Sequence, residues 1–226
     1  MDEKNIIVET ENETEAKPEL SLGQKVLRAF ERFGDLFVLN ICFFVSCIPI
    51  LTIGAAFTAL YTMTNKMVDS AEGSIVKYYF KAFRENLKQG LVIWIIDVLV
   101  FALVISGYLR YVSIVVFFLA CLAIPLQFPL LARYENSAFR IMTNSFLLAI
   151  AHPGAWFKLF FIWMLPVVLY YFYPRLIFTT WYIWGMGLSA IFAYICSGFL
   201  KDFYKTIEEE ERSKEGEKEN EQDSSD

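Results

Sequence analysis

One acidic residue, Asp97, lies in the middle of a long apolar stretch and is the clearest candidate for chemistry in this sequence. An ionised carboxylate within hydrocarbon costs at least ~2.5 kcal/mol unless it is paired or hydrated. Asp97 is therefore either a proton or cation site, with Asn40 and Gln127 as candidate polar neighbours, or a hydrogen-bonded structural residue facing other helices. The central parts of the apolar stretches contain no basic residue that could pair with it, and this favours the structural interpretation.

A second group of candidate residues is cationic and repeats with helical spacing. In a helix beginning at residue 75, four basic residues share one side and oppose an apolar side: Lys77, Lys81, Arg84 and Lys88 against Ile75, Tyr79, Phe83 and Leu87. Residues 133–151 predict a similar helix, in which one side carries Phe139, Met142, Phe146 and Ile150 and another carries Arg140. Such helices lie on an anionic membrane surface or dock on a partner protein. These five cations are therefore candidates for a membrane-surface or partner-binding face.

The composition indicates what surrounds these elements. The chain is 56% hydrophobic and 17% aromatic, with mean hydropathy +0.43, whereas soluble domains contain about 45–50% apolar residues. The excess must face lipid. The net charge of −5 arises mainly from acidic residues at the two ends. The basic clusters flank apolar stretches and do not form one face of a soluble domain, so no nucleic-acid partner is expected.

These patterns predict an all-α, polytopic transmembrane bundle with interfacial amphipathic helices. An acidic, disordered tail is expected at 1–20, an integral membrane domain at 21–207 and an acidic C-terminal tail at 208–226. Ser21 and Gln24 form a capping-box pattern at the first helix, which we expect to be short and amphipathic. About six spans follow, or five if the hairpin at 35–68 is re-entrant: 35–51, 53–68, 87–109, 112–131, 156–173 and 176–200.

The positions of the basic residues predict the orientation. Of 20 Lys and Arg residues, only Arg110 and Arg175 fall at the connections on one side of this topology. Because cytoplasmic loops carry the excess of Lys and Arg, both termini should be cytoplasmic.

Catalytic signatures are missing from the sequence. There is no Walker loop, GxGxxG, HExxH or GxSxG motif. The four cysteines lie in apolar stretches without a CxxC pair, which is typical of buried packing residues rather than of a metal site. We therefore expect no catalytic residue, metal or cofactor, and hence no enzyme. The permease loop pattern, an EAA run followed by a spaced glycine, is also missing from residues 135–152.

Several runs resemble the YesL family of bacterial membrane proteins: 31–40 (ERFGDLFVLN), 47–54 (CIPILTIG), 59–61 (ALY) and 80–89 (FKAFRENLKQ). The resemblance implies a polytopic plasma-membrane protein of uncharacterised activity, often encoded with sugar-uptake ABC transporters. It implies an accessory, assembly or regulatory partner of carbohydrate uptake, acting through cytoplasmic amphipathic helices on an ABC-type sugar permease or another membrane partner. The alternative is a small transporter or channel with a polar midplane site at Asp97. The sequence does not define the oligomeric state.

Overall fold

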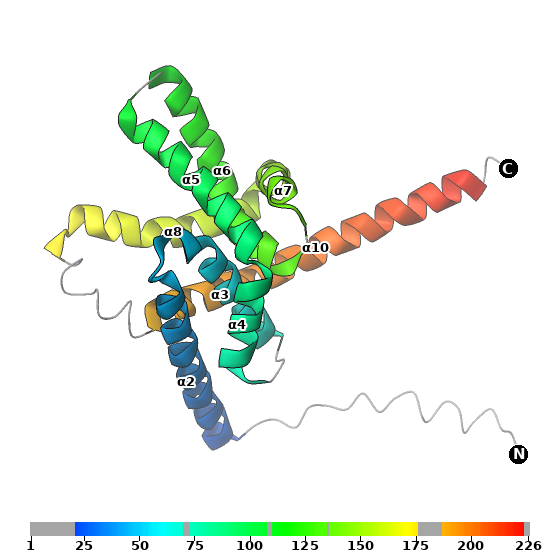
Figure 1. The fold of residues 1–226 in the computed structure, drawn as a ribbon. Helices are drawn as coiled ribbons and strands as arrows, with labels where there is room; N and C mark the ends of the chain where they lie inside the picture. Colours follow the sequence, from blue (N-terminus) through cyan, green and yellow to red (C-terminus); the bar gives the residue numbers. More distant parts are fainter. Residues whose placement is uncertain (1–20, 70–72, 108–109, 135, 176–186, 224–226) are drawn as a thin grey trace, which may run out of the picture. The chain divides into compact units, whose positions relative to one another are not determined.

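The computed structural model describes residues 21–69, 73–107, 110–134, 136–175 and 187–223, and all elements in these segments are helical (Figure 1). This confirms the all-α fold class. By their contacts, residues Met1–Gly34 and Asp35–Asp226 form two separate units. In order, the elements are α2 (Leu22–Cys47), the 3-10 turn η1 (Ile50–Thr52), α3 (Ile53–Val68), α4 (Ile75–Glu85), α5 (Leu87–Ser106), α6 (Arg110–Arg133), α7 (Ala138–Ala151), α8 (Pro153–Phe172) and α10 (Ser189–Asp223).

The predicted capping box at the start of α2 is confirmed. The backbone N–H of Ser21 donates to Gln24 Oε1 at 3.1 Å, and the backbone N–H of Gln24 donates to Ser21 Oγ at 3.5 Å. The first helix is not short, however, because α2 runs without interruption to Cys47. Gly34 alone weakens a helix by only about 1 kcal/mol, which does not stop it between two apolar segments. The predicted tail at 1–20 lies outside the described residues.

Helix α3 forms the centre of the second unit and packs against α4, α5, α6 and α10. Its small residues allow this close packing. Ten of its residues are buried: Gly54, Ala55, Ala56, Thr58, Ala59, Leu60, Tyr61, Met63, Thr64 and Met67. With 16 residues, α3 is about 24 Å long. It is not among the described helices that are long and apolar enough to cross a membrane.

Two glycines set the distance between α3 and α5. A Cβ built on Gly90 would lie 2.7 Å from the backbone nitrogen of Ala55 and 2.8 Å from its Cα. A Cβ on Gly54 would meet the carbonyl oxygen of Gly90. The two backbones are therefore in direct contact, and the crossing requires residues without a side chain.

Three described helices are long and apolar enough to cross a membrane: Leu87–Ser106, Tyr111–Arg133 and Pro153–Phe172. They coincide with three of the predicted spans. In α5 and α8 only 11% and 6% of the most apolar window is buried inside the protein, so most of these apolar side chains are at least partly accessible to surrounding lipid. Membrane association follows from this. The connection at 108–109 and the first part of the predicted sixth span, 176–186, lie outside the described residues.

The proline residues of α6 and α8 lie inside continuous helices. Pro125 cannot donate a backbone hydrogen bond, and this weakens the backbone ladder around residues 121–125. The indole N–H of Trp156 in α8 donates to the nearby carbonyl of Leu122 in α6 at 3.0 Å. The bond joins the two helices beside the proline.

Helix α7 packs against the protein by a different face from the apolar stripe identified in the sequence. The buried residues are Ile141, Ser145 and Ala149, while Phe139 and Ile150 of the predicted stripe are 78% and 57% exposed. Small residues bring α7 close to α6, and the large apolar side chains point outward, as is usual where helices meet lipid.

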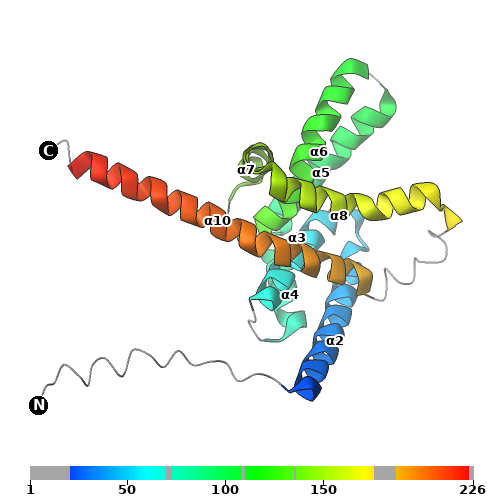
Figure 2. The same cartoon turned by 180° about the vertical axis from the view of Figure 1, so that it is seen from behind.

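Helix α10 packs along α3 and extends beyond the apolar core (Figure 2). The buried hydroxyls of Thr64 and Ser197 are 2.7 Å apart, and Lys201 Nζ lies 2.9 Å from Asp69 Oδ1. The helix continues to Asp223 and so includes most of the segment predicted as the acidic C-terminal tail, 208–226. The Glu, Lys and Arg residues of this segment are good helix formers, so an established helix can propagate through them.

Candidate functional site

Helix α4 is fixed on the protein by its apolar face. Tyr79 is fully buried, its hydroxyl donates to the carbonyl of Ala56 in α3 at 3.5 Å, and Ala82 is buried one turn further on. Burial raises the pKa of the Tyr79 phenol well above its ordinary value, so it remains a neutral packing residue. Since this face is held by α3, the opposite face of α4 must point away from the protein.

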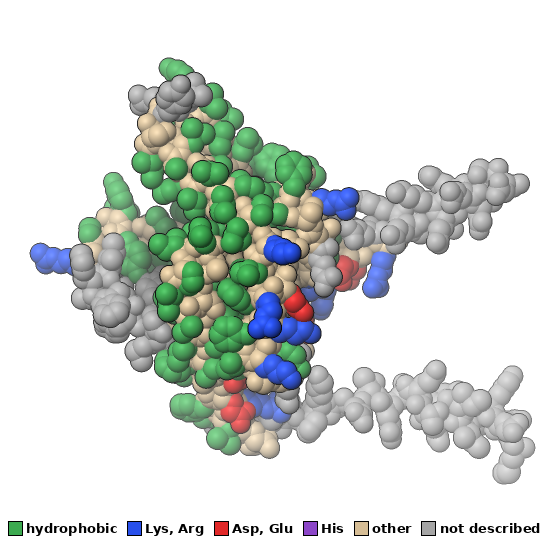
Figure 3. Space-filling view, in the orientation of Figure 1, with side chains coloured by type: hydrophobic (Ala, Val, Ile, Leu, Met, Phe, Trp, Pro, Cys, Tyr) green, Lys and Arg blue, Asp and Glu red, His purple; other side chains and the backbone are tan. Residues whose placement is uncertain are grey.

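The exposed face of α4 carries the predicted cations. Lys77, Lys81 and Arg84 are exposed, and Lys88 is exposed on the first turn of α5. Figure 3 shows Lys and Arg side chains gathered over α4 and the beginning of α5. Lys81 lies 3.8 Å from Glu85, but both side chains are more than half exposed, so this pair contributes little to stability. Hereafter Lys77, Lys81, Arg84 and Lys88 are called the basic face.

The fifth predicted cation, Arg140, belongs to a different element. It is exposed on α7, next to the exposed Phe139. It therefore forms part of a second amphipathic surface, in which one cation adjoins an outward-pointing apolar side chain. That combination suits a membrane interface, where the cation reaches headgroups and the ring enters the acyl region.

Asp97 and Gln127 line one pocket between α5, α6 and α7, as the sequence hypothesis for a site at Asp97 allowed. The pocket has a volume of about 330 Å³ and is otherwise mainly apolar. Gln127 lies close enough to Asp97 for a hydrogen bond between their side chains. Gln127 is 1% exposed, and its Oε1 has no hydrogen-bond partner within the described segments. The pocket is completed by Val100, Val116, Leu119, Ala120, Ala123, Met142, Thr143 and Phe146.

Asn40, the other candidate neighbour of Asp97, is not brought to this pocket. It is fully buried in α2, and its Oδ1 accepts a hydrogen bond at 3.2 Å from the backbone nitrogen of Ala190, at the beginning of α10. Asn40 thus supplies an acceptor to a buried backbone group of another helix. The structure gives it a role in packing α2 against α10.

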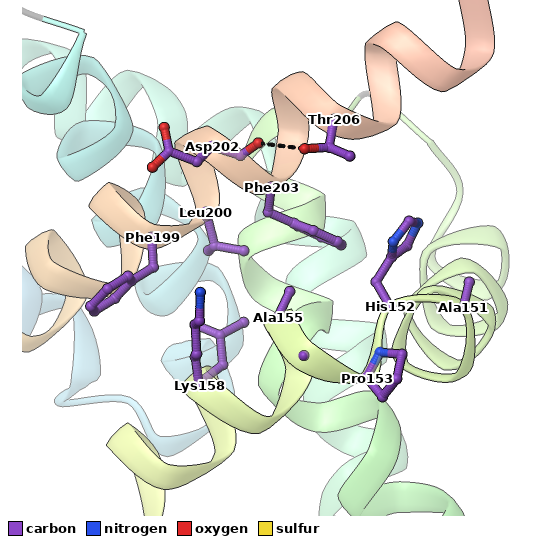
Figure 4. A pocket seen from close by; sticks show the side chains of 12 residues that line it. Ala151, His152, Pro153, Ala155, Lys158, Phe199, Leu200, Asp202, Phe203 and Thr206 are labelled. Carbon is purple, nitrogen blue, oxygen red and sulfur yellow. Dashed lines mark hydrogen bonds between the residues drawn. The ribbon is translucent and has the colours of Figure 1, made fainter.

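A second pocket, of about 470 Å³, lies between the α7–α8 connection and α10 (Figure 4). Its polar residues are His152, Lys158, Asp202 and Thr206. The His152 ring meets Phe203 edge-on at 5.3 Å, and the Thr206 hydroxyl donates to the Asp202 carbonyl at 3.2 Å. Sequence patterns do not indicate this pocket, because its polar residues come from segments about 50 positions apart in the chain.

Taken together, the helical fold, the three long apolar helices and the exposed basic face define a membrane-associated helical protein. Residues 36–108 match the model of a family described as "Protein of unknown function, DUF624". This is the YesL-like family, so the match confirms the resemblance over the segment from the second half of α2 to the end of α5. No curated protein and no solved structure matches the chain.

Proposed function

We propose that this chain is a multi-pass protein of the bacterial plasma membrane that serves as an accessory or assembly partner of a carbohydrate-uptake system. It carries out no catalytic step of its own and acts through cytoplasmic helices, α4 above all. The observation that supports this role is the way α4 is held. Its apolar face is buried against α3. The basic face therefore points away from the chain, where it can contact another surface.

The positive charge of the basic face indicates which kind of partner surface it can bind. Three cations on α4 and one on α5 complement an acidic surface, and such complementarity speeds association and sets its orientation. An ABC-type sugar permease, the partner implied by the family resemblance, presents cytoplasmic surfaces next to the membrane where α4 would lie. Arg140 on α7 is assigned to contacts with anionic lipid at the same side.

Reversing charge on α4 tests this role. We expect Lys77→Glu together with Arg84→Glu to reduce co-purification with an ABC-type sugar permease at least tenfold, because attraction to an acidic partner becomes repulsion. The measurement is affinity purification from the native membranes, with permease subunits quantified by mass spectrometry. The matched control is Lys205→Glu with Arg212→Glu, two exposed cations of α10, which changes the net charge equally. Equal permease recovery from both variants would contradict a role for α4.

The proposed orientation places both termini in the cytoplasm and the α5–α6 connection outside the cell. In a version with all four native cysteines replaced, we expect Ser106→Cys, at the end of α5, to react with an impermeant maleimide on intact cells. Ser213→Cys, in α10, should react only after the cells are permeabilised. Labelling in the opposite pattern would invert the topology, and labelling of both positions from outside would exclude it.

The pocket at Asp97 favours a second candidate function, that of a small transporter or channel. A carboxyl and an amide oxygen that has no partner among the described residues could together hold a solute or a proton during passage. This function differs from the first in one respect that can be measured. A transporter moves its solute when it is alone in a liposome, whereas an accessory protein requires its permease.

A further inference from the structure

The pocket between α5, α6 and α7 presents two hydrogen-bond acceptors, the carboxyl group of Asp97 and the amide oxygen of Gln127. Gln127 lies within hydrogen-bonding reach of Asp97; when its amide N–H donates to that carboxyl, its own oxygen is left free. That oxygen is buried and has no partner among the described residues. Thr143 already donates its hydroxyl proton to the carbonyl of Phe139 at 3.0 Å. A buried acceptor without a donor is costly, so the pocket is suited to a ligand that brings donors.

The charge of the pocket points in the same direction. Among the residues that the structure describes, Asp97 is the only ionisable one that lines the pocket, and no Lys, Arg or His lines it. A ligand that supplies both donors and positive charge would satisfy Gln127 and compensate an ionised Asp97 at the same time. A bare divalent cation fits poorly, because Ca²⁺ takes six to eight oxygen ligands and Mg²⁺ six, whereas the side chains here supply far fewer.

The remaining wall of the pocket is apolar. A ligand whose positive group binds Asp97 must therefore also carry an apolar part that fits this wall. Valine, leucine, alanine, methionine and phenylalanine side chains surround the two polar residues. A volume of about 330 Å³ lies within the range of pockets for small organic ligands. We propose that this pocket binds an organic ammonium ion carried on a small apolar body, with the ammonium group between Asp97 and Gln127 and the body against α6 and α7.

The position of the pocket indicates how such a ligand would enter. Leu119 is 45% exposed and Thr143 is exposed, so the pocket opens on the outer surface of the helices. Asp97 lies ten residues after Leu87, about 15 Å along the helix axis, and so lies well inside the span. An amphiphilic amine dissolved in the bilayer can reach this depth, whereas the headgroup of a lipid stays near the interface.

This inference deepens the second candidate function and rests on the same pocket, but it requires only binding. An experiment that disproves ammonium binding can therefore be told apart from one that disproves transport. Saturable binding without solute movement in liposomes would retain the ammonium site and exclude transport. The accessory role through the basic face is tested separately by co-purification and does not depend on either result.

The test uses the full chain in phosphatidylcholine nanodiscs and three probes with the same apolar body: 4-phenylbutylammonium, 4-phenylbutanol and 4-phenylbutanoate. Equilibrium dialysis is run in parallel with empty nanodiscs, and the amount of probe that partitions into their lipid is subtracted. We expect saturable binding of about one ammonium probe per chain, at least tenfold weaker binding of the alcohol, and no saturable binding of the carboxylate. Equal binding of the ammonium probe and the alcohol, or binding that never saturates, would overturn the proposal.

Variants separate the site from the rest of the protein. Asp97→Asn should weaken binding of the ammonium probe at least tenfold, and Gln127→Leu should weaken it severalfold. Ala120→Phe should fill the pocket and abolish binding although the carboxyl remains, which keeps the test decisive if Asp97→Asn fails to fold. The control Glu209→Gln removes an exposed carboxylate of α10 and should bind normally. Wild-type affinity in Asp97→Asn or Ala120→Phe would overturn the assignment.

The same ammonium chemistry occurs in the headgroup of phosphatidylethanolamine. Repeating the dialysis in nanodiscs that contain this lipid distinguishes the two sources. Undiminished binding of the probe identifies a free amine as the ligand, as the depth of Asp97 favours. Competition by the lipid that is lost in Asp97→Asn would identify the lipid amine as the occupant of the same ammonium site.

Discussion

Replacing Gly90 with alanine is expected to lower the free energy of unfolding by about 1–3 kcal/mol, as is typical when a packed contact is overfilled. The new Cβ would lie 2.7 Å from the backbone nitrogen of Ala55. Backbone atoms cannot rotate away as a side chain can, so α3 and α5 must separate and lose packing along the crossing. Alanine also stabilises a helix interior by up to ~1 kcal/mol relative to glycine. The destabilisation from lost packing must exceed this gain.

The measurement is thermal unfolding in detergent, followed with a thiol-reactive fluorophore, because Cys42 and Cys196 are buried in the folded protein. A fall in Tm of roughly 2–12 °C corresponds to the expected loss, at about 2–4 °C for each kcal/mol. Gly198→Ala in α10 is the matched control, since its Cβ meets no atom within 4 Å, and it should leave Tm unchanged or raise it. If Gly90→Ala matched this control, the close approach of α3 and α5 would be refuted.

Replacing Asn40 with alanine should be almost as damaging, at about 1–3 kcal/mol, the usual cost of leaving a buried polar group unsatisfied. The backbone nitrogen of Ala190 would lose its acceptor in a place without access to water. Asn144→Ala, an exposed position on α7, is the control, and a change within about 0.5 kcal/mol is expected there. The same thiol assay applies.

Asn40→Ala also distinguishes a packing role from a role in the Asp97 pocket. Asn40 does not line that pocket, so the folded fraction of the variant should bind the ammonium probe with wild-type affinity. A variant that kept its stability but lost ammonium binding would show that Asn40 belongs to the site after all.

The features that sequence reasoning predicted best depend on neighbouring residues in the chain. Ser21 and Gln24 form their capping box within one turn of helix. The apolar lengths that predicted α5, α6 and α8 follow from bilayer thickness, which requires no knowledge of the partner helices. For the site, the position of Asp97 within an apolar stretch was enough to predict that it would have a polar neighbour.

The features that were missed depend on which helices pack together. The contact of Gln127 rather than Asn40 with Asp97 follows from α5 pairing with α6, while α2 meets α10. The packing face of α7 was missed because large apolar residues normally mark the buried side, yet a helix beside lipid can bury Ile141 and Ser145 and expose Phe139. The second pocket brings together residues 50 positions apart, such as His152 and Asp202. Their spacing in the sequence does not indicate that they lie in the same pocket.

The central position of α3 limits how this family segment can exist by itself. Residues 36–108 include α3 but exclude α6 and α10, which cover much of its surface. Cut out alone, the segment would expose Leu60 and Thr64 to lipid and leave Thr64 without its contact to Ser197. A stand-alone version would need a substitute for the missing helices, so the segment must be inherited together with them or assemble with equivalent helices from another polypeptide.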